Sequence, residues 1–252
     1  MNRELKNPKS VISEIVILDS KSSDNSVEYA KQFDVNWIEQ EFVGYGPQKR
    51  IASSRAKNDW ILNLDADEVP TQEFFNGLNF FFEKQYLDFK AAEVLRDFIL
   101  FGKKLRFGGA SEQKKLRLFN RNFFDWNANL VHEAVVSITE KNGLKIGRIS
   151  GSLLHYSWAS TTDWLKVTDL RAQSLGAIKA SKYKFLLPRF FAFEVVLRFF
   201  LEFVRSYFIR LGFLDGVPGF VFCFFMAFSH VLKLIKCFEI CTNYQNTTEG
   251  SE

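Results

Sequence analysis

The segment Ile61–Glu68 (ILNLDADE) constrains the fold of this chain most strongly. An apolar run leads directly into Asp65 and Asp67, which one residue separates, and Glu68 follows. This order is typical of a strand that is buried and then reaches solvent at its carboxyl end. Because carboxylates this close repel one another, we expect a positive group between them, most simply a hard divalent cation that also binds phosphate. The alternative is a solvated acidic turn, since short acidic patterns are common.

The segments before this one predict alternating strands and helices. A short apolar run ends in Asp19, and Asp24 is a suitable N-cap for the helical pattern that follows. The further elements expected are a strand at 35–38, a loop at 44–47, a helix at 49–57 and the strand that ends at Asp65. The alternation indicates an α/β sheet with ligands at the carboxyl ends of its strands. Asp19 and Asp65 would then lie at the same edge of the sheet.

The middle of the chain has a different pattern. Residues 71–87 predict a helix, whereas residues 91–137 contain short runs broken by glycines and asparagines, which indicates antiparallel strands or ordered loops. Two apolar stretches end in a histidine, at His132 and His155. A helix is expected at 166–181.

The C-terminal third is rich in phenylalanine and basic. About half of the 29 phenylalanines fall between Phe185 and Phe238, and residues 161–241 carry 11 Lys/Arg against 6 Asp/Glu. Basic side chains that flank long apolar runs suit an anionic membrane surface better than nucleic acid. The three cysteines form no metal pattern, so a reduced, cytosolic setting is expected. The polar N-terminal decapeptide has no apolar core for a signal peptide.

Two helices are expected in this third, at 187–211 and 221–235, with a turn at 212–219. The first places Glu194, Arg198, Glu202 and Arg205 on one face, where neighbours can pair. The second is short for a membrane span and includes polar residues, so an in-plane or re-entrant hairpin is favoured over a crossing. A buried helical hairpin or an oligomer interface is the alternative.

Together these motifs resemble the family 2 glycosyltransferases, in particular the bacterial branch that adds glucose or heptose to the lipopolysaccharide core (the LOS β-1,4-glucosyltransferase type). The matching segments occur in the family's order: Asp19–Asp24 (DSKSSD), Gly44–Lys49 (GYGPQK), Asp59–Glu68 (DWILNLDADE), Lys115–Phe119 (KLRLF), Val131–Glu133 (VHE) and Gly212–Gly216 (GFLDG). Each motif alone is weak, but six in order are specific.

The resemblance implies a GT-A-type nucleotide-diphospho-sugar transferase sheet flanked by helices, with a C-terminal amphipathic, apolar helical hairpin. It implies a transferase domain at 1–160, a basic, Phe-rich membrane-associating region at 161–241 and a polar tail at 242–252. The expected reaction is inverting transfer of a hexose or heptose, with UDP-glucose as donor, to a lipopolysaccharide or lipooligosaccharide core. The expected location is the cytoplasmic face of the bacterial inner membrane, as a peripheral or monotopic protein that binds no nucleic acid.

The resemblance also assigns roles to individual residues. Nucleotide contacts are expected from Asp19, which would accept a hydrogen bond from uracil, and from Lys49, Asp65 and Arg117. The expected ligands of Mg²⁺ or Mn²⁺ are Asp67, Asp65 and His155. Glu133 would be the general base, with His132 orienting it. The plainer alternatives are a solvated basic face for Arg117 and an ordinary hydrogen-bonded side chain for His155.

Two departures from the family pattern leave further alternatives open. A strand that ends in Asn-Glu usually precedes the Asp19 motif, and Lys21 stands where the family has glycine. Without that strand, two strands lose a ladder partner, and one solution is direct pairing of the strands ending at Asp19 and Asp65. Either the true start lies further upstream, or the chain is a truncated, catalytically weak remnant. A less favoured alternative is a haloacid-dehalogenase-type phosphatase, which Asp65 to Val69 also fits, although no later acidic pair follows.

Overall fold

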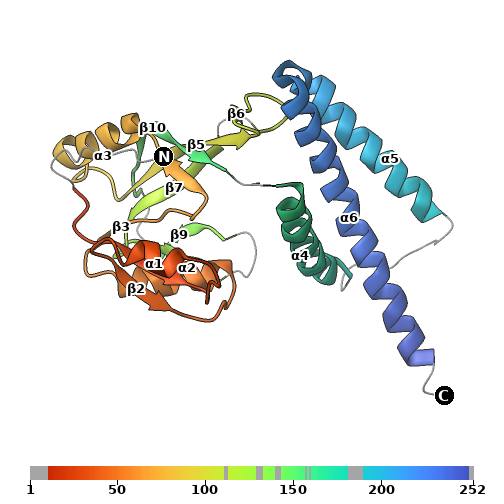
Figure 1. Ribbon diagram of the computed structural model, residues 1–252, viewed down its shortest axis with the longest axis horizontal. Coiled ribbons are helices and arrows are strands. Elements are labelled where there is room, and N and C mark those ends of the chain that lie inside the picture. The colour runs from red at the N-terminus through yellow and green to blue at the C-terminus, as the bar shows by residue number, and fades with distance from the viewer. Residues whose placement is uncertain are drawn as a thin grey trace. The chain divides into compact units, whose positions relative to one another are not determined.

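The computed structural model describes residues 11–110, 113–128, 133–139, 143–156, 158, 160–180 and 190–249. The chain forms two compact units (Figure 1). Unit 1 comprises Met1–Arg96 and Lys114–Leu153, and unit 2 comprises Asp97–Gln113 and Leu154–Glu252. The sequence predicted a domain at 1–160, whereas unit 2 begins its C-terminal part at Leu154 and also includes residues 97–113.

Unit 1 begins with the expected alternation of strands and helices. Its first elements are β1 (Val16–Asp19), α1 (Ser26–Ala30), β2 (Asn36–Glu39) and α2 (Tyr45–Arg55). β1 pairs in parallel with β2, so Asp19 lies beside Glu39 at the carboxyl end of both strands. In the described part of the chain this is a separate two-stranded sheet, and β3 pairs with β7 instead of β1. The expectation of one sheet that joins the Asp19 and Asp65 strands is therefore wrong for these residues.

The main sheet has six strands in the order β3-β7-β5-β10-β4, with β6 paired to β5. The strands are β3 (Trp60–Leu62), β4 (Glu68–Pro70), β5 (Ala91–Leu100), β6 (Lys103–Lys104), β7 (Gln113–Asn120) and β10 (Ile146–His155). A separate antiparallel pair is formed by β8 (Phe124–Trp126) and β9 (Val135–Ser137). The antiparallel strands predicted for residues 91–137 are thus confirmed, and β7 is placed beside the end of β3.

One helix, α3 (Gln72–Lys84), packs tightly on this sheet. The Thr71 hydroxyl caps it by accepting a hydrogen bond from Phe74 N at 3.2 Å. Gly151 of β10 has φ +79°, and a Cβ there would lie 2.2 Å from Phe74 N, so only glycine permits this approach. The buried core beneath the helix contains Phe74, Leu78, Phe81, Ala92, Val94, Leu118, Ile149 and Leu153.

Unit 2 is built from helices and the segment 97–113, which includes the end of β5 and the short strand β6. Its elements are α4 (Thr161–Ala180), α5 (Phe191–Val204), the π-helical turn η2 (Arg205–Ile209), the 3₁₀ turn η3 (Gly212–Asp215) and α6 (Gly216–Glu249). Both α4 and α5 pack along α6, and Trp164 stacks on Phe225 with ring centroids 4.3 Å apart. A buried cluster joins this segment to α6, and its members are Leu100, Leu105, Ala110, Phe222 and Cys223.

The α5–α6 hairpin matches the prediction, but α6 is longer than expected. It continues through the predicted polar tail to Glu249, so the argument that the second helix is short for a span is wrong about its length. Within the described residues, Gly212–Thr242 is long and apolar enough to cross a membrane, a property that core helices of soluble proteins share. On α5, Arg198 pairs with Glu194 at 2.7 Å, whereas Glu202 lies 3.7 Å from Arg205.

Candidate active site

The acidic motif of the sequence forms a turn between β3 and β4. Glu68 N donates to Asp65 O at 3.0 Å, and Asp65 N donates to Glu68 Oε2 at 3.2 Å, so the two residues brace each other. The register of β3 with β7 pairs Leu62 with Leu118, and Asn63 N donates to Arg117 O at 2.9 Å. Pairing of β3 with β7 therefore positions Arg117 beside the acidic turn.

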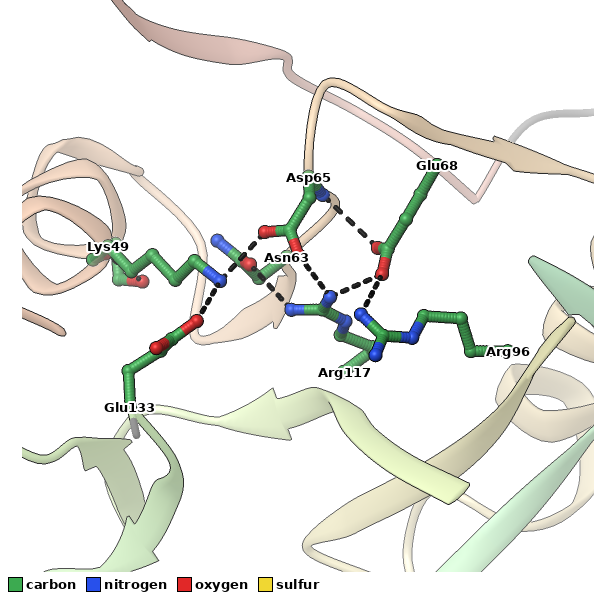
Figure 2. A network of polar contacts seen from close by, with 8 residues as sticks. Lys49, Asn63, Asp65, Glu68, Arg96, Arg117 and Glu133 are labelled. Carbon is green, nitrogen blue, oxygen red and sulfur yellow. Dashed lines mark hydrogen bonds and ion pairs between the residues drawn. The ribbon is translucent and has the colours of Figure 1, made fainter. Parts of the chain in front are cut away.

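Arg117 lies between the carboxylates of Asp65 and Glu68 (Figure 2). Its Nη2 donates to both, and its Nη1 lies 3.4 Å from Asn63 Oδ1. The residue is 3% exposed, so the alternative of a solvated basic face is wrong. Arg96 of β5 adds a second cation 3.5 Å from Glu68 Oε1. The positive group expected between the carboxylates is therefore, within the described residues, an arginine.

Lys49 connects this turn to a third segment of the chain. Its Nζ lies 2.7 Å from Asp65 Oδ1 and 3.1 Å from Glu133 Oε1 (Figure 2). The ammonium also lies over the Trp126 ring, 4.8 Å from its centroid, which favours a cation there. Arg50 ties the same helix, α2, to β8 by pairing with Asp125 at 2.8 Å. Lys49, Asp65, Arg117 and Glu133, which were predicted from four motifs, thus meet in one network.

The charges in this network shift several pKa values. Burial alone would raise the pKa of Asp65, but the charges of Arg117 and Lys49 outweigh burial and lower it to about 2. Burial opposes the charge on Arg117, yet Asp65 and Glu68 raise its pKa above the usual value. For Lys115, burial and then the like charges of Arg96 and Arg117 lower the pKa. The cations of the site therefore keep Asp65 ionised.

The Asp19 turn is organised independently. Asp19 is 9% exposed and accepts hydrogen bonds from the Ser22 hydroxyl and from Ser22 N, the latter at 2.9 Å. Lys21 has φ +62°, in the left-handed region that glycine occupies without strain. Glycine would therefore suit the backbone conformation at this position better than lysine. Gln48 Nε2 donates to Ser20 Oγ at 3.1 Å. The adjacent residues Gln48 and Lys49 of α2 therefore contact the Asp19 turn and Asp65, respectively.

Comparison with known proteins identifies the family that the chain resembles. Residues 5–129 match the family model described as Glycosyl transferase family 2. Over these residues, about half of its length, the chain is similar to that family. Uncharacterized glycosyltransferases of Rickettsia are similar along almost the whole chain. The protein of Rickettsia typhi is 28% identical over 97% of this chain and 84% of its own length, and that of Rickettsia felis is 29% identical over 99% and 89%.

Among solved structures, residues 1–349 of TarS from S. aureus cover 93% of this chain and 82% of their own length. The identity is 12% and the TM-score is 0.34, a similarity too low to bear on the site. The mixed sheet flanked by helices and the long apolar C-terminal helix are those expected from the sequence.

The metal ligands predicted from the resemblance come from two segments, because Asp65 and Asp67 follow β3 and His155 ends β10. Within the described residues, no group of three or more His, Cys, Asp or Glu side chains is arranged to hold a metal. Both oxygens of Asp65 already contact cations. His155 belongs to unit 2, where its ring lies 5.5 Å from that of Phe98. A divalent ion that takes one carboxylate from Asp67 and its other oxygens from a diphosphate fits these residues.

Two residues of the network were missed by sequence reasoning, and one predicted residue is not described. Glu68 was noted only as a third carboxylate, yet its side chain is fully buried between two arginines. Arg96 was not singled out, because Glu93 and Asp97 also place charges in β5 and no pattern distinguished it from them. His132 lies outside the described residues. Asp24 accepts from Ser26 N at 3.0 Å beside the start of α1, although the N-cap position itself is Asn25.

Proposed function

We propose that this protein is an inverting glycosyltransferase that moves a hexose or heptose from a nucleotide-diphosphate sugar to a lipopolysaccharide or lipooligosaccharide core. UDP-glucose is the first donor to test. The family 2 domain supports sugar transfer in general. The donor, acceptor and stereochemistry are inferred from the motifs that resemble the lipopolysaccharide-core branch.

The observation that carries this proposal is the double contact of Lys49. One ammonium joins Asp65, at the end of the acidic motif, to Glu133, the residue proposed as general base, at 2.7 and 3.1 Å. These residues are 16 and 84 positions away from Lys49 in the chain. A purely structural acidic turn would have no need of the second carboxylate. This convergence supports a shared site for the acidic motif and the candidate base.

The proposed donor contacts follow from the charges. Lys49 would exchange a carboxylate contact for a phosphate contact when the donor enters, and its positive charge would favour a diphosphate. Asp19 would accept a hydrogen bond from the uracil ring, and Asp65 would contact the ribose. Arg117 would act mainly by holding Asp65 ionised and oriented, since its own donors are directed at the carboxylates.

In the proposed reaction, Glu133 removes the proton of an acceptor hydroxyl. That oxygen attacks the anomeric carbon from the side opposite the diphosphate, the carbon–oxygen bond to the diphosphate breaks, and the nucleoside diphosphate leaves. Mg²⁺ or Mn²⁺ held by Asp67 would supply neutralising charge for that leaving group. Lys49 and Arg117 contribute fixed positive charge to the same end of the site.

We also propose that the protein works at the cytoplasmic face of the bacterial inner membrane, as a peripheral or monotopic protein. The support is the basic, Phe-rich composition of the C-terminal third and the long apolar helix α6. An acceptor with a lipid anchor would be reached from such a position.

The test is donor binding and turnover by the purified chain. UDP with Mn²⁺ is expected to raise the melting temperature, and UDP-glucose to be consumed with a lipooligosaccharide acceptor, with inverted anomeric configuration in the product. Glu133→Gln should lower kcat about 10²- to 10⁴-fold while UDP binding is kept, as expected for loss of a general base. Glu83→Gln, an exposed position on α3, is the matched control.

Other outcomes would contradict the proposal in different ways. Nucleotide binding without turnover of any donor would indicate a catalytically weak remnant. The absence of a melting shift with every nucleoside diphosphate would overturn the donor assignment. Release of inorganic phosphate from sugar phosphates, abolished by Asp65→Asn, would indicate a phosphatase. Unchanged kcat in Glu133→Gln would exclude Glu133 as the base.

A further inference from the structure

Unit 2 exposes a compact group of large apolar side chains between α5 and α6. We call this group the apolar tip, and its members are Phe208, Ile209, Leu211, Phe213, Leu214 and Val217, each at least 42% exposed. Two short turns, η2 and η3, and the left-handed Leu211 (φ +58°) hold these side chains in the connection between the two helices. A clustered apolar surface of this kind indicates an interaction site, whereas single exposed apolar residues do not.

The buried residue Asp215 links the apolar tip to a basic loop, residues 103–108. Oδ2 of Asp215 accepts hydrogen bonds from Arg106 N and Phe107 N at 2.8 and 2.9 Å, and its backbone oxygen accepts one from Lys103 Nζ at 2.7 Å. Gly108 N donates to Arg210 O at 2.8 Å. The loop and the tip are therefore one structural feature, and the side chain of Asp215 is engaged by backbone amides.

A pocket of about 430 Å³ opens where the loop and the tip meet. The residues that line it are Gly102, Lys103, Lys104, Arg106, Phe107, Leu214 and Asp215. Its lining thus combines three cationic side chains with two apolar ones. Arg106 and Lys103 are exposed, whereas Lys104 is partly covered and pairs with the buried Asp97 at 2.8 Å.

The loop and the apolar tip together carry more positive than negative charge. Segments 103–110 and 205–217 contain five cationic residues and one acidic residue, Asp215. Two carboxylates from neighbouring elements also contact these cations, Asp97 at Lys104 and Glu202 at Arg205. Counting both, five positive charges face three negative ones, a surplus of two. A basic pocket beside exposed apolar side chains is the arrangement of interfacial membrane-binding segments.

We propose that this pocket binds the phosphate of an anionic phospholipid headgroup while the apolar tip inserts among the acyl chains. The proposal deepens the proposed function and rests on it only in placing the protein at a membrane. It names a specific headgroup site, formed by Lys103, Lys104 and Arg106, where composition alone indicates only a diffuse basic surface.

The test is sedimentation of the full chain with lipid vesicles, in which no nucleotide sugar takes part. Vesicles of phosphatidylcholine alone, phosphatidylcholine with phosphatidylglycerol, and phosphatidylcholine with oleate at equal surface charge are compared. The protein is expected to bind the phosphatidylglycerol vesicles best. Arg106→Gln and Lys103→Gln should each weaken that binding about fivefold, the effect of one cation at an anionic surface. Because the assay does not involve sugar transfer, its failure leaves the enzymatic proposal intact.

Matched controls separate the pocket from general charge and apolarity. Lys166→Gln removes an exposed cation of α4 in the same unit and should leave binding unchanged. Ile209→Asp should abolish binding, whereas Leu87→Asp should not, although both side chains are 72% exposed. Circular dichroism of each variant shows whether the fold is kept, and a second tip variant, Val217→Asp, tests the same point at another position.

Several results would overturn the proposal. Equal binding to oleate and phosphatidylglycerol vesicles, or an equal loss in Lys166→Gln, would show diffuse electrostatic attraction. Equal binding to phosphatidylcholine alone would show that the tip acts without the pocket. Binding of glycerol phosphate by the chain together with no binding to any vesicle would assign the pocket to a soluble phosphate.

Discussion

Units 1 and 2 place their charged and apolar side chains in opposite ways. In unit 1, Arg117 is 3% exposed and Glu68 is fully buried, and each is neutralised by a partner inside the protein. In unit 2, large apolar side chains such as Ile209 are exposed and the cations around them exceed the carboxylates. Buried charges must be paired internally because desolvation is costly, whereas exposed apolar groups become stabilising only against an external partner. The first arrangement fixes a site, and the second requires a surface to bind.

The largest effect expected in this comparison comes from breaking the buried network at Glu68. Glu68→Ala leaves Arg117 and Arg96 without this carboxylate and should lower the free energy of unfolding by about 3–5 kcal/mol, the usual cost of an uncompensated buried charge. Urea denaturation measures this change. Glu68→Gln, which keeps the volume but not the charge, separates the ionic effect from the cavity.

The matched control for Glu68 is Glu83→Ala on the exposed face of α3, where a change within about 0.5 kcal/mol is expected. Equal stability of Glu68→Ala and Glu83→Ala would show that the buried network contributes nothing to folding.

A smaller effect is expected from acid. The pKa of Asp65 falls from its ordinary 3.8 to about 2 in the folded protein. Because the folded pKa is the lower one, its contribution of about 2 kcal/mol is fully present above the ordinary pKa and is lost as pH falls through the folded pKa. The free energy of unfolding of the protein and of Asp65→Asn can be measured by denaturation across this pH range. It should depend less on pH in the variant. Parallel curves would contradict the pairing of Asp65 with Lys49 and Arg117.

The sequence predicted the members of this site better than their contacts. Lys49, Asp65, Arg117 and Glu133 were found through motifs, and the apolar-to-acidic order located the end of β3. That Arg117 lies between the carboxylates depends on the register of β3 with β7, which joins residues more than 50 positions apart. Short-range periodicity holds no information on such a pairing.

The limits of α6 show a different difficulty. The apolar pattern weakens beyond Ile235, and Thr242 to Thr248 read as a polar tail, yet the helix continues to Glu249. Propagating an existing helix requires only one hydrogen bond for each residue fixed, so polar residues can extend a helix that packing has already nucleated. Patterns of hydrophobicity locate the packed part of a helix and not its end.

The smallest effect expected is at the surface of unit 2, where Arg198 pairs with Glu194 at 2.7 Å on α5. Both side chains are more than a third exposed, so solvent and salt weaken the attraction. A double-mutant cycle with Glu194→Ala, Arg198→Ala and both should give a coupling free energy of about 0.3–0.5 kcal/mol at low salt, falling towards zero at high salt. A coupling as large as the loss in Glu68→Ala, or one that salt does not change, would contradict the contrast between the units. The expected tenfold difference between the two pairs reflects burial, since both join an arginine to a glutamate.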